Sequence, residues 1–154
     1  MIKINVILNN IIWKKYLKYP RSYINKKLYL LNKKNKSYKK NIFTCSLLLS
    51  GTTEIKKLNK KFRKKNRSTD ILSFPFYEKK YLKNIIKRKK EIYLGDIIIN
   101  LSKIKNKNNK DKFQNELNKL WIHGLVHLFG YQHKKDRDFH VMRKIEKKYL
   151  GYIH

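Results

Sequence analysis

The most informative segment of this chain reads His123-Gly124-Leu125-Val126-His127-Leu128-Phe129-Gly130-Tyr131-Gln132-His133. Residues i and i+4 lie on the same side of a helix, so His123 and His127 can present two imidazoles to one ion. Gly130 tolerates a positive φ, so the helix can end there and the chain can return His133 to the same ion. The competing interpretation is a pair of buried core histidines. The third histidine and the glycine in register favour a metal site.

Three neutral imidazoles leave one coordination position open, which is typical of catalytic rather than structural zinc. We therefore expect one Zn²⁺ per chain, although nickel and cobalt also accept such ligands. The metzincin motif H-E-x-x-H-x-x-G-x-x-H matches the three ligands and the glycine in register. Gly124 stands where that motif has its general base, which argues against a peptidase.

The length of 154 residues predicts a single domain over 1–154 with a core of its own. Cys45 is the one cysteine, so no internal disulfide can form, and a buried thiol is expected. No apolar run approaches the roughly 20 residues of a membrane span. The first residues alternate like a strand and do not resemble a signal peptide, so we expect a cytoplasmic protein.

The formal net charge of +30 is extreme for a chain of this size. It predicts a polyanionic partner, with RNA the first candidate, and disfavours a neutral small molecule as the substrate. Only six of the forty basic residues are arginine, although arginine suits phosphate best. A compositional bias toward lysine, asparagine and isoleucine is therefore an equally good explanation of much of the charge.

Hydrophobic patterns predict an α+β fold, with a small mixed sheet of about four strands packed against helices and a late helix that carries the metal site. We expect strands at 2–8, 42–50, 71–76 and 94–100. We expect helices at 10–19, 51–64, 113–129 and 138–150, and one with a basic face that opens the stretch 21–40. We expect loops at 32–40, 77–91 and 106–112. Pro20 and Gly151 are expected to end the helices before them.

Three further segments carry recognisable patterns. They read Leu58-Asn59-Lys60-Lys61-Phe62-Arg63, Thr69-Asp70-Ile71-Leu72-Ser73-Phe74-Pro75 and Leu94-Gly95-Asp96-Ile97. Together with 123–133, they resemble the YbeY family of bacterial single-strand-specific endoribonucleases, the rRNA maturation factors. The family hallmark is similar to H-G-x-L-H-L-x-G-Y-D-H, and the family's later Met and Glu recur as Met142 and Glu146. Gln132 departs from the family aspartate and removes a charge next to the third histidine.

The resemblance marks Arg63 as functionally essential, and a guanidinium there suits clamping the scissile phosphate. The alternative is a structural Arg63 paired with Asp70 or Asp96. These two carboxylates are candidates for contacts behind the metal ligands, for holding Arg63, or for the general base. Thr69 and Ser73 are candidate substrate contacts, with strand packing as the alternative. Attack by a ribose 2′-hydroxyl and attack by an activated water both stay open.

The resemblance therefore implies a zinc-dependent endoribonuclease that acts on single-stranded RNA. It implies a role in rRNA maturation on the small ribosomal subunit, in late processing of the 16S rRNA 3′ end, and in ribosome quality control. The sequence points to no obligate protein partner. The alternative is a ribosome assembly protein whose metal is mainly structural and whose nuclease activity is low.

Overall fold

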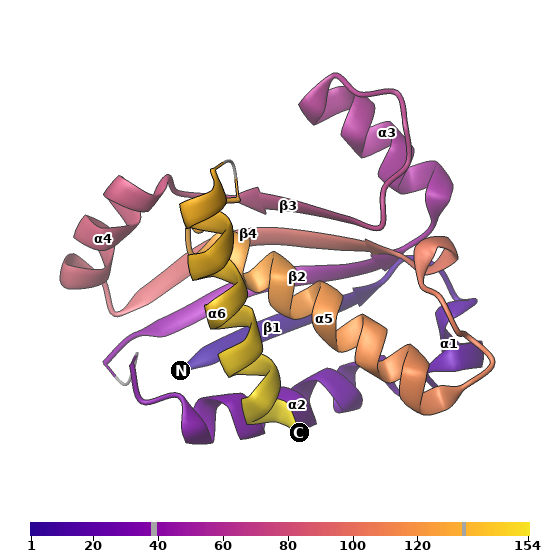
Figure 1. Ribbon diagram of the computed structural model, residues 1–154, viewed down its shortest axis with the longest axis horizontal. Helices are drawn as coiled ribbons and strands as arrows, with labels where there is room; N and C mark the ends of the chain where they lie inside the picture. The colour runs from indigo at the N-terminus through magenta and orange to yellow at the C-terminus, as the bar shows by residue number, and fades with distance from the viewer. Residues whose placement is uncertain (38–39, 134) are drawn as a thin grey trace.

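A mixed sheet of four strands forms the centre of the computed structural model, which describes residues 1–37, 40–133 and 135–154 (Figure 1). The strands are β1 (Ile2–Leu8), β2 (Ile42–Ser50), β3 (Ile71–Pro75) and β4 (Glu91–Asn100). Their order is β1-β2-β4-β3; β1, β2 and β4 are parallel, and β3 runs antiparallel to β4 as an edge strand. The predicted α+β class with a small mixed sheet is confirmed.

The helices lie on both sides of this sheet. They are α1 (Trp13–Tyr16), α2 (Pro20–Lys34), α3 (Thr52–Arg63), α4 (Lys79–Arg88), α5 (Lys110–Leu128) and α6 (Asp136–Ile153), with a 3₁₀ turn at Leu101–Lys103. Figure 1 shows α5 and α6 in front of the sheet and α3 near one end of β3. Helix α5 packs on β3 and β4, and α6 packs on α5 and α2.

The core is divided by the sheet into a large and a small part. The large cluster includes Ile97 of β4 and Trp121 and Leu125 of α5, all fully buried. The small cluster, Ile55, Leu72 and Ile98, lies beneath α3. Successive strand residues point to opposite faces, so Ile97 belongs to the large cluster and Ile98 to the small one. Helix α5, which carries His123 and His127, thus lies on the face of Ile97.

The segment 77–91 was predicted to be an exposed loop, and that prediction is wrong. Lys79–Arg88 form α4, in which Leu82 is buried and Ile85 and Ile86 pack against the core. These three residues follow the i, i+3, i+4 spacing of an amphipathic helix. The surrounding lysines obscure this spacing in the sequence because they make the segment 77–91 polar on average.

Two predicted helix ends are also wrong. The helix predicted at 10–19 is limited to Trp13–Tyr16, and Pro20 opens α2 instead of ending the helix before it. Proline suits the first helical position because its missing N–H would have no helical partner there. Gly151 lies within α6, which continues to the fully buried Ile153.

The remaining differences concern boundaries. The loop predicted at 32–40 is helical as far as Lys34, and residues 38 and 39 lie outside the described residues. Strand β4 begins at Glu91 instead of residue 94. Helix α5 begins within the predicted 106–112 loop, where the Asn109 side chain accepts a hydrogen bond from the Lys112 N–H and caps it.

Within the described part of the chain, no helix combines the length and the apolar character that a membrane span requires.

Candidate metal centre

The C-terminal end of α5 closes with a glycine turn that brings the third histidine back toward the first two. Gly130 has φ +85°, a conformation that favours glycine. The Gly130 N–H donates to His127 O (2.8 Å), and the Tyr131 N–H donates to Val126 O (3.4 Å). This pair of bonds is the Schellman pattern. It reverses the chain after α5, so the loop that follows carries His133 to the same place as His123 and His127.

Hydrogen bonds at Nδ1 fix the ring orientations of His123 and His127. His123 Nδ1–H donates to the Glu146 carboxylate of α6 at 2.7 Å, and His127 Nδ1–H donates to the Tyr131 carbonyl at 2.8 Å. A carboxylate and a carbonyl can only accept, so both protons are on Nδ1. Both Nε2 lone pairs are therefore free to bind a cation. Metal-binding histidines in proteins are oriented in the same way.

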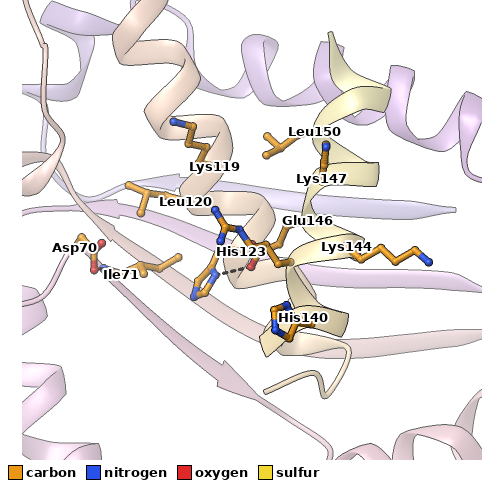
Figure 2. Close-up of a pocket in the computed structure, with 11 residues that line it drawn as sticks. Asp70, Ile71, Lys119, Leu120, His123, His140, Lys144, Glu146, Lys147 and Leu150 are labelled. Atoms are coloured by element: carbon orange, nitrogen blue, oxygen red, sulfur yellow. Dashed lines mark hydrogen bonds and ion pairs between the residues drawn. The ribbon is translucent and has the colours of Figure 1, made fainter. Parts of the chain in front are cut away.

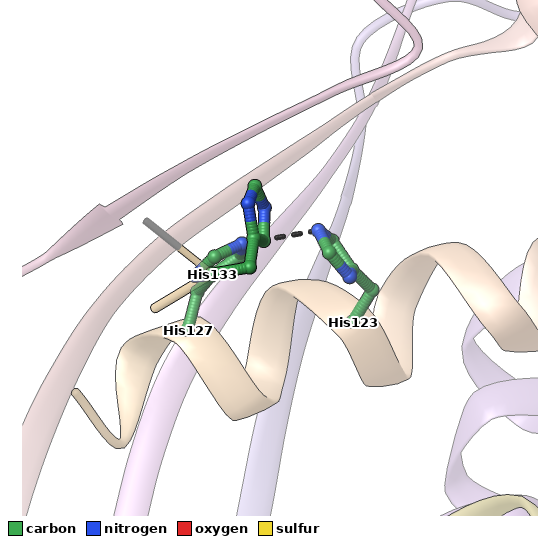
Figure 3. Close-up of side chains that lie close together, drawn as sticks. All are labelled: His123, His127 and His133. Carbon is green, nitrogen blue, oxygen red and sulfur yellow. Dashed lines mark hydrogen bonds between the residues drawn. The ribbon is translucent and has the colours of Figure 1, made fainter. Parts of the chain in front are cut away.

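The two Nε2 atoms lie 3.0 Å apart (Figure 3), close to the roughly 3.3 Å expected for two nitrogens on one tetrahedral zinc. With both protons on Nδ1, this contact joins two lone pairs, which repel each other unless a cation lies between them. Burial and the neighbouring His123 lower the pKa of His127 to about 4, so this ring stays neutral near neutral pH, as a metal ligand must. A divalent metal ion therefore fits the site.

His133 completes the donor set. One ligand nitrogen from each of His123, His127 and His133 lies within 4.8 Å of the others. Figure 3 shows the three rings turned toward one another, with His133 coming from the loop and the other two from α5. His133 is exposed, whereas His123 and His127 are half-buried. The open side of the cluster therefore faces solvent, where a substrate can approach.

Gly124 faces the sheet, away from the open side of the cluster. A Cβ built on Gly124 would lie 2.7 Å from Ile97 Cγ2 and 3.1 Å from Ile71 Cδ1. Glycine is thus needed for α5 to approach the sheet this closely. A glutamate at this position would be pressed against two isoleucines, so this site cannot hold the base of a metalloprotease there.

A cleft of about 1010 Å³ opens beside His123, between α5, α6 and the start of β3 (Figure 2). Asp70 and Ile71 lie on its β3 side, and Glu146 reaches His123 from α6. The Asp70 carboxylate accepts hydrogen bonds from Thr69 Oγ1 (3.0 Å) and from the Ile71 N–H (2.9 Å). The structure therefore brings Asp70 to the same cleft as one predicted metal ligand.

Arg63 lies in a different cavity. It lines a space of about 270 Å³ together with Lys65, Arg67 and Thr69. One of its terminal nitrogens donates to the Ser73 carbonyl at 3.2 Å, and its guanidinium lies 5.8 Å from the centre of the Phe74 ring. Among the described residues it has no ion pair with Asp70 or Asp96. Thr69 and Asp70 thus separate the Arg63 cavity from the histidine cleft.

Ser73 and Asp96 lie on opposite faces of the sheet. Ser73 is buried opposite Ile97 on the α5 face, and its hydroxyl has no hydrogen-bond partner among the described residues. Asp96 is opposite Phe74 and accepts a 2.6 Å hydrogen bond from Tyr93 Oη. Asp96 therefore lies on the α3 face, and the sheet separates it from the histidines.

The sequence did not identify the partner of His123. In the sequence, Glu146 stands out only because it matches a glutamate of the family pattern, and that match does not indicate a contact with His123. Its one local signal is a carboxylate four residues after the buried Met142, on the inner side of a basic helix. Gln132 is exposed beside His133, and no hydrogen bond joins its side chain to another described residue.

The chain resembles proteins of one family over almost its whole length. The family model for "Endoribonuclease YbeY" matches residues 11–154. An endoribonuclease YbeY of Pelagibacter ubique is 42% identical over 155 residues, which cover 99% of this chain and 97% of the relative. That of Thermodesulfovibrio yellowstonii is 37% identical over 82% of this chain and 75% of its own length. The solution structure of TM1509 from Thermotoga maritima superposes with a TM-score of 0.59 and 27% identity over 98% of this chain and 89% of that one.

Proposed function

The chain belongs to the endoribonuclease YbeY family, and from this membership we propose that it is a metal-dependent hydrolase that cuts single-stranded RNA. The observation that carries the proposal is the cluster of His123, His127 and His133, which opens beside a cleft with basic walls. In the cell we assign it to rRNA maturation on the small ribosomal subunit. The proposed roles are the late processing of the 16S rRNA 3′ end and ribosome quality control. Both would take place in the cytoplasm.

The proposed cofactor is one Zn²⁺, held by His123, His127 and His133. Three imidazoles favour zinc among the common cellular metals, and they also accept nickel or cobalt. When bound, such an ion supplies Lewis-acid polarisation of a phosphoryl oxygen and eases deprotonation of water. Glu146 and the Tyr131 carbonyl keep two of the ligands in the tautomer that binding needs.

Arg63 is proposed to hold the RNA backbone. Its bond to the Ser73 carbonyl places the guanidinium at the edge strand β3, and Lys65 and Arg67 line the same cavity. A guanidinium can bind a phosphate with two parallel hydrogen bonds and stabilise charge that develops on it. RNA that passes over Thr69 and Asp70 would contact Arg63 on one side and the histidine cleft on the other.

Asp70 is the better candidate for a general base than Asp96, because Asp70 lines the cleft beside His123 and Asp96 lies behind the sheet. A base must come within hydrogen-bond distance of the proton that it removes, either directly or through one water. Thr69 is proposed as a substrate contact at the boundary between the two cavities. The buried position of Ser73 suits strand packing, with its carbonyl holding Arg63.

Cleavage of a labelled single-stranded RNA by Arg63→Ala tests this account. We expect the variant to keep its metal and its fold and to cut at least about 100-fold more slowly, because it lacks one charge-stabilising group. Lys56→Ala, an exposed substitution on the same helix, should cut at the wild-type rate. Equal rates for the two variants would make Arg63 structural. Bound metal without any cleavage in the wild type would instead support the assembly protein with a structural metal.

A further inference from the structure

Helix α6 borders the histidine cleft with cations that carboxylates do not neutralise. Arg143 and Lys147 are four residues apart, hence on the same side of the helix, and both line the cleft. Neither forms an ion pair with a carboxylate in the part of the chain that the structure describes. The carboxylates of the cleft are engaged elsewhere: Glu146 holds His123, and Asp70 accepts two local hydrogen bonds. Arg143 and Lys147 are therefore available to an anion that enters the cleft.

An exposed aromatic ring lies next to Arg143 at the metal centre. Phe139 is 45% exposed, and the guanidinium of Arg143 lies 5.7 Å from the centre of its ring. A smaller cavity of about 190 Å³ is lined by Phe139 and Arg143 together with His123 and His133. Isolated exposed aromatic residues are common on proteins and need no function. Phe139 differs from them because it shares a cavity with two of the predicted metal ligands.

Arg143 connects this small cavity with the large cleft, since it lines both. One guanidinium thus lies between an aromatic face, two metal-binding imidazoles and a cationic groove. Proteins that bind single-stranded nucleic acid combine these features, with bases stacked on aromatic rings and phosphates held along a basic groove. Arginine suits the phosphate position because its planar donors match two phosphate oxygens.

We propose that Phe139 and Arg143 form a nucleotide-binding element, in which Phe139 stacks the base next to the scissile phosphate and Arg143 holds an adjacent phosphate. This inference rests on the proposed function, because it assigns single-stranded RNA to the same cleft. It gives that function a physical source of strand selectivity. A base inside a duplex is stacked between its neighbours and cannot reach the Phe139 ring, whereas an unpaired base can.

Binding of short RNAs that lack a single base tests the stacking contact. A five-nucleotide single-stranded RNA and its five abasic variants are titrated into the full-length protein, with chelator present so that no RNA is cut. We expect the wild type to lose roughly 5- to 150-fold in affinity for one abasic position. Phe139→Leu should bind the complete RNA as weakly as the wild type binds that abasic RNA, and should be insensitive to the missing base.

Tyr19→Leu is the matched control for Phe139. Tyr19 is 66% exposed, with the Lys18 ammonium 5.4 Å from its ring centre, and it lines neither the cleft nor the small cavity. This variant should keep the wild-type response to the abasic series. The inference is overturned if Phe139→Leu also keeps that response, or if no abasic position weakens binding to the wild type.

The salt dependence of the same binding tests Arg143. Removing one phosphate contact from a single strand lowers the slope of log Kd against log salt concentration by about 0.7. Arg143→Gln should show this decrease, and Arg143→Lys should restore most of the slope. Arg137→Gln makes the same charge change on the first turn of α6, outside both cavities, and should leave the slope unchanged. Equal slopes for Arg143→Gln and Arg137→Gln contradict the assignment.

The binding measurements and the cleavage assay test separate claims, so either can fail without the other. A protein reloaded with zinc that does not cut RNA counts against the proposed function, whatever its affinity. A protein that cuts RNA but ignores the abasic substitution at every position retains the proposed function and refutes the role of Phe139.

Discussion

Glutamine in place of Glu146 should weaken metal binding, although Glu146 is not itself one of the proposed metal ligands. The substitution keeps an acceptor oxygen opposite His123 Nδ1 and removes the negative charge. The bond is short, at 2.7 Å, and its two side chains are only partly exposed, at 31% for His123 and 22% for Glu146. We therefore expect the ring to stay in place while its Nε2 becomes a poorer donor to the metal.

The size of the effect follows from the loss of charge assistance. A hydrogen bond to a charged group contributes about 1.5–3 kcal/mol net, and a neutral one about 0.5–1.5 kcal/mol. The difference of about 1–1.5 kcal/mol corresponds to roughly a tenfold higher Kd for the metal. Partial solvent exposure of the pair places the effect at the lower end of the 10- to 100-fold range typical of such contacts.

Competition with a chromophoric zinc chelator measures this Kd. Glu116→Gln is the control, since it removes a carboxylate of α5 whose 3.0 Å partner is the exposed Lys119 ammonium. We expect the Kd of this control to equal that of the wild type. The orientation of His123 by Glu146 is refuted if the two glutamine variants bind zinc within a factor of two of each other.

Three further outcomes follow from the packing and the charges of the site. Gly124→Ala should lower the free energy of unfolding by about 1–3 kcal/mol, because the new methyl group overlaps Ile97; Gly151→Ala, where a Cβ meets open space, should raise it by about 0.5–1 kcal/mol, and denaturant titration of both variants checks the pair. In the metal-free protein, stability should fall as pH drops from about 6.5 to about 4, since the unfolded chain protonates His127 in this range and the folded chain, with a pKa of about 4, does not. Thermal unfolding with chelator should show that His127→Gln is less sensitive to pH than the wild type over this interval, and an equal pH dependence would disprove the assignment. His127→Ala should bind no zinc at the triad and should lose the increase in melting temperature that zinc gives the wild type; unchanged metal content by elemental analysis would remove His127 from the ligand set.

The clustering of His123, His127 and His133 could be predicted from the sequence because local geometry determines most of it. The three histidines lie within eleven consecutive residues, so no distant segment is needed to bring them together. The i, i+4 spacing places His123 and His127 on one side of α5, and the turn at Gly130 returns His133 to them. The strands were predictable for a similar reason, since alternating burial in segments such as β1 reflects local periodicity.

The contacts around the cluster depend on tertiary structure and were out of reach of such patterns. The pairing of Glu146 with His123 needs the angle between α6 and α5, and the separation of Asp96 from the histidines depends on which face of the sheet α5 covers. Arg63 is the last residue of α3 and bonds to a carbonyl of β3, so it lies on the α3 side of that strand. The sequence shows only that Arg63 follows Asn59 on a helix, and it does not show which strand this helix end approaches. The helix α4 was missed because lysines outnumber its few buried apolar residues.

The most direct test of a metal-dependent ribonuclease centre is elemental analysis of the purified protein combined with cleavage of single-stranded RNA before chelation, after chelation and after zinc is restored. We expect about one zinc per chain, cleavage that chelator abolishes, and recovery of cleavage when zinc returns. Cleavage that continues at the same rate in a metal-free protein would contradict this expectation.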